Sequence, residues 1–164
     1  MATHIDALLG DYESVVRFNI DAIRADNHFS KVFPETASST SFYFGYIAHE
    51  YNMLVYGGIL GGMEGIAIEY ARNLNAVLNE DFYTCHPDMA TYLESYSALD
   101  IHVLLRFGRW DDLLALTLPI DDKIMLYRGA MLRAARAVAL ANKRSWKNFI
   151  TVMKQPSERS ITIR

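Results

Sequence analysis

The chain has 164 residues and a net charge of −3, and its 51% hydrophobic and 21% charged residues are typical of one folded domain and unlike a disordered protein. The N-terminus lacks the basic start and apolar run of a signal peptide, and the most apolar window, residues 53–62, is too short to span a membrane. Cys85 is the only cysteine, which excludes an internal disulfide and is typical of a reducing compartment, so we expect a cytoplasmic protein with no membrane span.

Apolar residues at helical spacing predict helices throughout the first half of the chain. Gly10 permits a tight turn after a short helix, and Asp11 is placed to cap the next one. Gly57-Gly58 is either a notch for helix contact or a frayed end, and Gly61-Gly62 predicts the next turn. The predicted helices are 2–9, 11–26, 41–60 and 63–78, with a Pro-, Ser- and Thr-containing loop at 27–40.

The second half continues the helical pattern. We expect a loop at 79–88, a turn at Gly108 and the end of a short helix before Pro119. The predicted helices cover about 88–107, 109–117, 122–142 and 145–154. No segment predicts a strand, so the expected fold class is all-α, with about eight helices in antiparallel pairs. Residues 1–154 form one predicted domain, and 155–164 a loose C-terminal tail.

The predicted helix pairs share a sequence register. The turns are anchored at Gly10, Gly62, Gly108 and, less well, Asn142. Two residues after the anchors stand Tyr12, Glu64, Trp110 and Arg144, and five residues after them stand Val15, Ala67, Leu113 and Lys147. Because a lysine is unsuited to a buried position, the fourth copy of the pattern is degraded.

At these turns the chain resembles tetratricopeptide-repeat (TPR) proteins, whose units pair two helices around a glycine turn. The best-matching segment is residues 10–26, beginning Gly10-Asp-Tyr, and the next is residues 107–114, Phe-Gly-Arg-Trp-Asp-Asp-Leu-Leu. Thr3-His4-Ile5 and His49-Glu50-Tyr51-Asn52 make the chain similar to a divergent, mostly uncharacterised TPR group, in which a second histidine often occupies the place of Asn52. The resemblance implies a TPR-like α-solenoid over about residues 2–150.

The register also predicts a row of side chains along the array. Positions six residues before the anchors are equivalent and lie in a row when repeats stack. On the first helix of the second pair, His49, Asn52 and Tyr56 share one face. On the first helix of the third pair, His102 and Arg106 share one face. The TPR resemblance implies that this face lines a groove that receives a peptide or a partner segment. The candidate ligand contacts are His4, His49, Asn52, Tyr56, His102, Arg106 and Arg136.

The histidines of this row have two other interpretations. A histidine on a packed helix is usually a hydrogen-bonded member of the core. If His4, His49 and His102 instead converge on one pocket, the protein is an enzyme, metal-dependent or not. His49-Glu50-Tyr51-Asn52 lacks the second histidine of a His-Glu-x-x-His zinc site, and no other pair has ligand spacing. We therefore expect an interaction scaffold with no catalytic residue, metal ion or cofactor.

The expected partner is a protein or a peptide. Residues 128–154 contain seven basic side chains and no acidic one, which suits nucleic acid, an anionic membrane or a solvated helix face. Since the whole chain is acidic, we favour the solvated face, and nucleic acid is not the expected partner. The short first helix and the degraded fourth copy favour a homo-oligomer or a longer repeat array.

Overall fold

The computed structural model describes residues 2–36, 38, 41–120, 124–145, 148, 150 and 151. Every regular element among them is a helix, which confirms the all-α prediction. The elements are α1 (Ala2–Leu9), α2 (Tyr12–Val32), α3 (Phe42–Leu60), α4 (Glu64–Val77), α5 (Glu80–Cys85), α6 (Pro87–Leu93), the 3₁₀-helix η1 (Glu94–Ala98), α7 (Leu99–Arg106), α8 (Trp110–Ala115) and α9 (Leu126–Asn142). Most of the predicted last helix, 145–154, and all of the tail, 155–164, lie outside the described residues.

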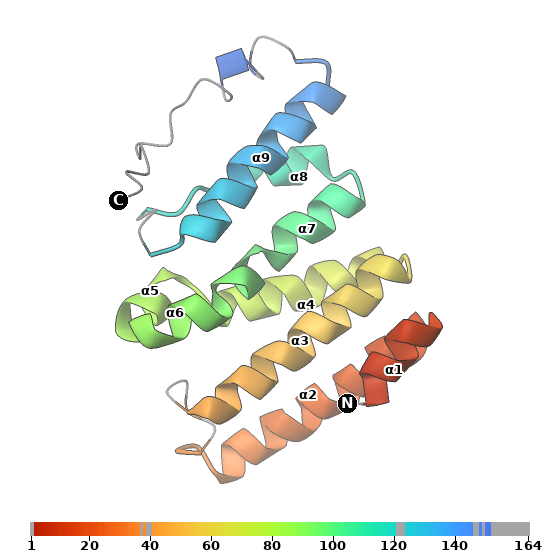
Figure 1. Cartoon of the computed structure of the whole chain (residues 1–164), viewed down its shortest axis with the longest axis vertical. Coiled ribbons are helices and arrows are strands. Elements are labelled where there is room, and N and C mark those ends of the chain that lie inside the picture. Colours follow the sequence, from red (N-terminus) through yellow and green to blue (C-terminus); the bar gives the residue numbers. More distant parts are fainter. Residues whose placement is uncertain are drawn as a thin grey trace, which may run out of the picture.

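The long helices follow one another in chain order along the longest axis of the molecule (Figure 1). α1 and α2 lie at one end, α8 and α9 at the other, and each long helix packs mainly against its neighbours in sequence. The short helices α5 and α6 project to one side at the level of α4 (Figure 1). The result is an elongated stack in which α1, α3 and α7 each begin a two-helix hairpin.

Two predicted segments differ from the structure. α2 continues to Val32, because Phe29 is packed by the rings of Phe33 and Tyr43, whose centroids lie 5.0 and 5.1 Å away. The predicted loop at 79–88 is wrong, since Asn79 caps α5 by accepting a hydrogen bond from the Phe82 N–H at 2.9 Å. A loop therefore separates α2 from α3 only after residue 32, and α5 and α6 fill the connection between the second and third hairpins.

The predicted single helix over 88–107 is interrupted. η1 separates α6 from α7, and Ser97 Oγ donates a hydrogen bond to the Glu94 carbonyl at 2.6 Å within it. Serine side chains compete with helical backbone hydrogen bonds in this way. The interruption turns α7 toward α4 and α9, where its apolar residues are buried.

Glycines set the spacing of the first three long helices. An added Cβ at Gly57 would stand 2.8 Å from Val15 Cγ1 of α2, and one at Gly58 would stand 3.0 Å from Ala67 Cβ of α4. Both distances are too short for a methyl group without movement of the neighbour. Gly57-Gly58 is therefore a notch for helix contact, and α3 is packed closely on both sides.

Four turns share one hydrogen-bond pattern. Gly10, Gly62, Gly108 and Arg144 have positive φ angles of 79°, 73°, 67° and 53°. The N–H of the residue after each donates to the carbonyl five positions earlier, at 2.8 to 2.9 Å, which is the Schellman arrangement that ends a helix. The fourth anchor is therefore Arg144. The backbone φ angle and hydrogen bond of this turn correct the prediction of Asn142. In the sequence, Trp146 and Phe149 then stand two and five residues after the fourth anchor.

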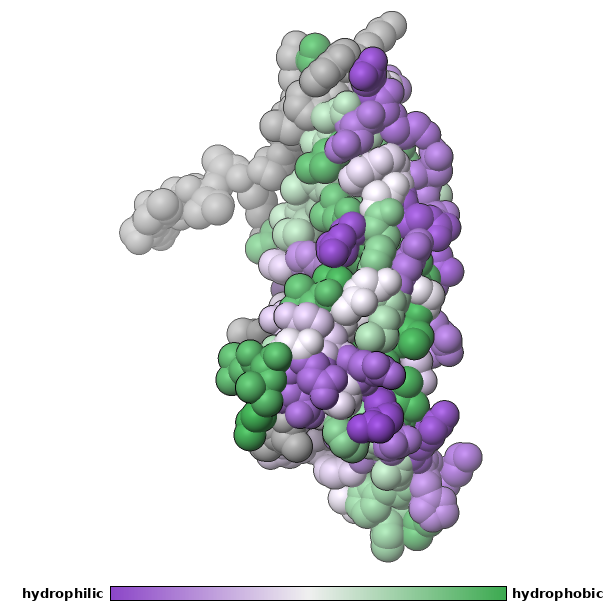
Figure 2. All heavy atoms as spheres, turned by 90° about the vertical axis from the view of Figure 1, so that its right-hand side faces the viewer, coloured by the Kyte–Doolittle hydropathy of each residue, from purple (hydrophilic) through white to green (hydrophobic). Residues whose placement is uncertain are grey.

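Exposed apolar side chains gather on the surface at one end of the stack. Figure 2 shows strongly hydrophobic atoms standing out at the height of α1, where Ile5, Leu8 and Leu9 are exposed, Leu8 to 88%. No helix among the described residues combines the length and the apolar character needed to cross a membrane.

Candidate functional site

A cavity of about 320 Å³ opens between α1, α2 and α3. It contains two of the predicted contact residues, His4 from α1 and His49 from α3, whose ring centroids are 5.2 Å apart. His4 holds a register position, whereas His49 was predicted from the helix face that it shares with Tyr56, and the fold brings these two histidines together. The lining residues are Thr3, His4, Phe18, Asn19, Ala22, Tyr46, His49, Glu50 and Met53.

The two imidazoles are poor partners for each other. Burial lowers the pKa of His49, and the nearby His4 lowers it further, so His49 is neutral at pH 7. His4 Nδ1 is buried and has no hydrogen-bond partner among the described residues. A buried ring nitrogen without a partner has lost its hydration, so it gains by meeting a ligand with a complementary group.

Behind the histidines lies a pair of acidic side chains. Asp26 Oδ1 accepts a hydrogen bond from the Tyr43 hydroxyl at 2.5 Å, and this bond raises the pKa of Tyr43 to about 12. Burial, together with a hydrogen bond to Asp26 and its negative charge, raises the pKa of Glu50 to about 8. At pH 7 the Glu50 carboxyl therefore keeps its proton, which is available for a hydrogen bond to Asp26.

The protonation of Glu50 also explains two otherwise unpartnered atoms. Asp26 Oδ2 and Glu50 Oε2 are both buried and have no conventional donor among the described residues. Two ionised carboxyl groups would present only acceptors to each other, whereas one shared proton lets them hydrogen bond. The pair gains a second negative charge when the pH rises past about 8 or when a bound cation replaces the proton.

Asn19 is the most buried polar side chain of the cavity. It is 4% exposed, and its Nδ2 donates to the Val15 carbonyl at 2.7 Å. Its Oδ1 accepts no hydrogen bond from the described residues, and Asn19 lines the cavity. Val15, Asn19 and Ile23 are four residues apart on one face of α2, so a polar residue within an apolar stripe was the signal for this site in the sequence.

The remaining α3 residues of the predicted row lie outside this cavity. Asn52 is half-buried, Tyr56 is 47% exposed, and neither lines the space between α1 and α3. Arg106 of α7 is exposed, with its guanidinium carbon 5.6 Å from the centroid of the Phe107 ring. These three residues stay candidate contacts of a groove and take no part in the cavity.

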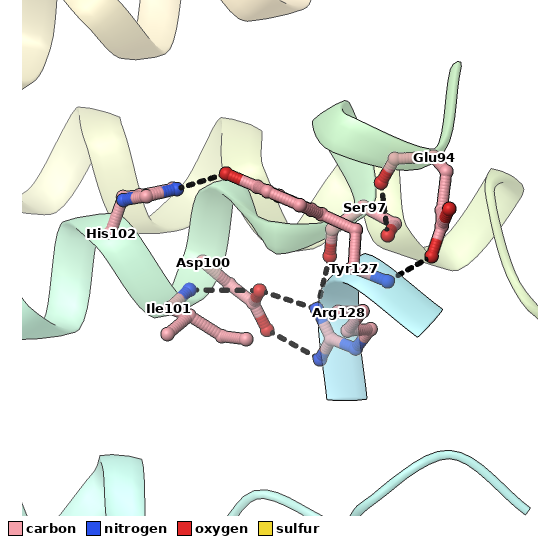
Figure 3. A network of polar contacts seen from close by, with 7 residues as sticks. All are labelled: Glu94, Ser97, Asp100, Ile101, His102, Tyr127 and Arg128. Atoms are coloured by element: carbon pink, nitrogen blue, oxygen red, sulfur yellow. Dashed lines mark hydrogen bonds and ion pairs between the residues drawn. The ribbon is translucent and has the colours of Figure 1, made fainter. Parts of the chain in front are cut away.

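His102 belongs to a different environment from His4 and His49. Its Nε2 lies 3.4 Å from the Tyr127 hydroxyl, and burial lowers its pKa while Asp100 opposes the shift. His102 does not line the α1–α3 cavity, so the three histidines do not converge on one pocket. Figure 3 shows it beside a polar network that joins η1 and α7 to the start of α9.

This network is closed within the protein. Asp100 accepts two hydrogen bonds from Arg128, at 2.7 and 3.0 Å, and the two side chains are only 10% and 14% exposed. Arg128 also donates to the Ser97 carbonyl, and the Tyr127 N–H donates to Glu94 (Figure 3). Because its charges are paired and most of its donors are hydrogen-bonded within the protein, the network holds η1 and α7 against α9 and forms a structural joint between helices.

Arg136 does not hold the row position that the fourth turn of the structure defines. With Arg144 as the fourth anchor, Val138 stands six residues before it, and Arg136 does not. The Arg136 guanidinium instead donates to the Leu116 carbonyl at the end of α8. Its role in the structure is to tie α9 to the segment after α8.

Three basic side chains of the 128–154 stretch bind groups within the domain. Arg128 pairs with Asp100, Arg136 binds the Leu116 carbonyl, and Lys143 forms an ion pair with Asp111 of α8. These contacts agree with the interpretation of a helix face that meets acidic and carbonyl oxygens. The described residues contain no group of three His, Cys, Asp or Glu side chains that could hold a metal ion.

Comparisons with known proteins do not identify a relative. No family model matches the chain, and searches of curated proteins and of solved structures find no match. Any assignment of function must therefore come from the cavity and its surroundings.

Proposed function

We propose that this protein is an interaction module, a TPR-like array that binds a peptide segment or a partner protein in a groove along α1, α3 and α7. The observation that carries the proposal is the cavity between α1 and α3. It contains His4 of the row and His49 of the adjoining α3 face, and the His4 Nδ1 atom is buried without a partner among the described residues.

The repeated turns support the proposal independently. Three glycines and Arg144 end four helices with the same backbone hydrogen bond. Repeated geometry of this kind places successive first helices in similar orientations, and a continuous surface along such helices suits an extended ligand. Aromatic and apolar side chains at the mouth, Phe18 and Tyr46, would supply affinity, and the polar groups would set orientation.

The test is a selection of random displayed peptides on the immobilised protein, followed by titration of the enriched peptides. Ala22 lines the cavity, and Ala25 is exposed one turn later on the same helix. We expect Ala22→Phe to fill the cavity and to weaken peptide binding at least tenfold, a change of about 1.4 kcal/mol. Ala25→Phe adds the same side chain outside the cavity and should change affinity less than about twofold.

Circular dichroism and thermal melting of both variants check that they are folded. Enriched peptides that bind wild type and Ala22→Phe equally would contradict a ligand site in this cavity. A selection that enriches no peptide above an empty surface would contradict the interaction module itself.

The enzymatic alternative has one observation in its favour. Glu50 keeps its proton at neutral pH, as a general acid must, and lies in a cavity with two histidines. Elemental analysis of the purified protein tests the metal-dependent form. Stoichiometric metal that is lost in His49→Ala, but kept in His28→Ala on the exposed part of α2, would favour the enzyme over the interaction module.

A further inference from the structure

We propose that the α1–α3 cavity selects a primary ammonium group, presented as the end of a lysine side chain of the bound segment. The inference rests on the proposed function, because it names the side chain that the groove would recognise. Among the nine described residues that line the cavity, none is a lysine or an arginine.

The unpartnered atoms of the cavity are mainly acceptors. Asn19 Oδ1 receives no hydrogen bond from the described residues, and Asn19 is almost completely buried. Apart from the proton that they share, Asp26 Oδ2 and Glu50 Oε2 have no donor among the described residues, and His4 Nδ1 is buried without a partner. An ammonium group has three donors and no acceptor, so it matches this set better than a carboxylate, a phosphate or a hydroxyl does.

The walls suit the methylene chain that precedes an ammonium group. Phe18, Tyr46 and Met53 provide apolar and aromatic surface beside the acceptors. The face of an aromatic ring attracts cations, and the Arg17 guanidinium carbon already lies 4.7 Å from the centroid of the Phe18 ring. Residues 1–82 carry 4 basic and 11 acidic side chains, so the surrounding field also attracts a cation.

Hydrogen-bond donors, and not charge alone, distinguish the expected ligand. A trimethylated lysine has the same charge but no donor, so it cannot hydrogen bond Asn19 Oδ1 or the acid pair. A norleucine side chain fills the same apolar walls without charge or donors. The structure therefore predicts the order lysine, then trimethyl-lysine, then norleucine.

Binding of an ammonium group would change the protonation of the acid pair. The charged or titratable groups around Glu50 include His4 from α1, Asp26 from α2, and Tyr43 and His49 from α3, and the positive charge of the N-terminus acts to lower the pKa of Glu50. The ligand replaces the shared proton with a positive charge and with donors, so Glu50 ionises and its proton passes to the solvent. Because one proton leaves for each ligand bound, affinity for the ammonium group should rise with pH up to about 8.

The experiment is an NMR titration of the ¹⁵N-labelled protein with Nα-acetyl-lysine amide, with its trimethyl-lysine and norleucine analogues as comparisons. We expect shifts of α1, α2 and α3 amides around the cavity with the lysine probe, and at least tenfold weaker binding of norleucine. Between pH 6 and pH 7 the dissociation constant of the lysine probe should fall by up to about tenfold, as release of one proton requires.

Three variants separate this recognition from general attraction of cations. Asn19→Leu removes the buried acceptor at similar volume, and Glu50→Gln prevents the second negative charge; each should weaken the lysine probe at least tenfold, and Glu50→Gln should abolish the pH dependence. Asp21→Asn removes one charge from an exposed position of α2 outside the cavity, so it should change affinity less than about twofold. If Asn19→Leu fails to fold, Glu50→Gln still decides, because Glu50 is already uncharged at pH 7.

The outcomes for the inference and for the proposed function are distinct. If selected peptides bind and Ala22→Phe blocks them, but lysine and norleucine probes bind equally, the function stands and the ammonium specificity is overturned. Shifts outside the cavity, or an equal loss in Asp21→Asn, overturn it as well. If the lysine probe binds as expected but no peptide is enriched, the ammonium site stands and the interaction module is contradicted.

Discussion

The α1–α3 region and the η1–α9 region bury similar polar groups but use them differently. At the α7–α9 contact, Asp100 and Arg128 satisfy each other in a bidentate pair, and the neighbouring carbonyls and N–H groups are also engaged. At the α1–α3 contact, atoms of His4 and of the Asp26–Glu50 pair lack ordinary partners and lie around an open cavity. Polar groups that are paired hold helices in place, whereas polar groups left short of partners mark where a ligand is expected.

His4 and His102 show that the repeat register alone does not decide whether a polar side chain lies at a cavity or in a paired network. Both stand six residues before a positive-φ glycine. His4 meets His49 across the cavity, while His102 meets Tyr127 of α9 beside a closed network. The same position in the repeat thus serves a candidate site at one end of the stack and a structural joint at the other.

Breaking the Asp100–Arg128 pair should have the largest effect on stability. Asp100→Asn keeps the shape but leaves the Arg128 charge buried without a counter-charge, so we expect a loss of about 3 kcal/mol in the free energy of unfolding. Urea denaturation followed by circular dichroism measures it. The control is Asp21→Asn, which breaks the exposed pair with Arg24 and should cost less than about 1 kcal/mol. Equal losses in the two variants would contradict a structural role for the network.

The turns offer the next comparison. Gly108→Ala places a Cβ at a φ of 67° and should destabilise the protein by about 1 to 2 kcal/mol through backbone strain, since its surroundings leave room for a methyl group. Arg144→Gly relieves the same strain at a φ of 53° and should stabilise by about 0.5 to 1 kcal/mol. Thermal melting of the two variants tests both expectations. A loss of stability in Arg144→Gly would show that the contacts of the arginine side chain stabilise the protein by more than its backbone strain destabilises it.

The two regions can also be compared by removing one tyrosine hydroxyl from each. Tyr43→Phe removes a 2.5 Å hydrogen bond to Asp26 and should cost about 1 kcal/mol. Tyr127→Phe removes only the long, exposed contact with His102 and should cost less than about 0.5 kcal/mol. Chemical denaturation at pH 7 distinguishes them, and the reverse order would place the stronger polar contact at the α7–α9 joint.

The smallest expected effect is that of Glu50→Gln near pH 4, below about 0.5 kcal/mol, because glutamine resembles the side chain that is then protonated in both the folded and the unfolded chain. The effect grows as the pH rises, in favour of the variant. The folded protein raises the pKa of Glu50 from 4.5 to about 8, so wild type binds an extra proton on folding and loses stability as pH rises between these values. Glu50→Gln lacks this loss, and its stability relative to wild type should increase from pH 5 to pH 8.5.

The two histidines act in the opposite sense. Burial lowers the pKa values of His49 and His102, so the folded protein releases protons from them and loses stability as pH falls below 6.5. Since both variants of the comparison retain these histidines, the difference between wild type and Glu50→Gln isolates Glu50. Urea midpoints at pH 5, 7 and 8.5 measure it, and parallel profiles would contradict a protonated Glu50.

Local sequence signals determined the helices and the glycine turns. Asp11 accepts a hydrogen bond from the Ser14 N–H at 3.1 Å as an N-cap, and Gly10, Gly62 and Gly108 all adopt the positive φ that the turns require. These features depend on the backbone and on neighbours within one turn of helix, so the residue type is enough to predict them. The meeting of His4 with His49 is a tertiary contact between α1 and α3, because the register made Tyr56, and not His49, equivalent to His4.

Tertiary contacts decided the rest. Arg144 adopts an unfavourable φ because the end of α9 requires it, and no arginine signals a turn in a sequence. Asp26 and Glu50 meet, and His102 is diverted to Tyr127, only because of how α2, α3, α7 and α9 pack. The sequence by itself therefore determined the all-helical fold class and the glycine turns, through short-range hydrogen bonds and side-chain pattern, while the end of α2 and the helices between residues 79 and 107 depended on packing and local side-chain contacts. The fold determined which polar groups are paired and which are not, since burial and charge at a site depend on residues far apart in the chain.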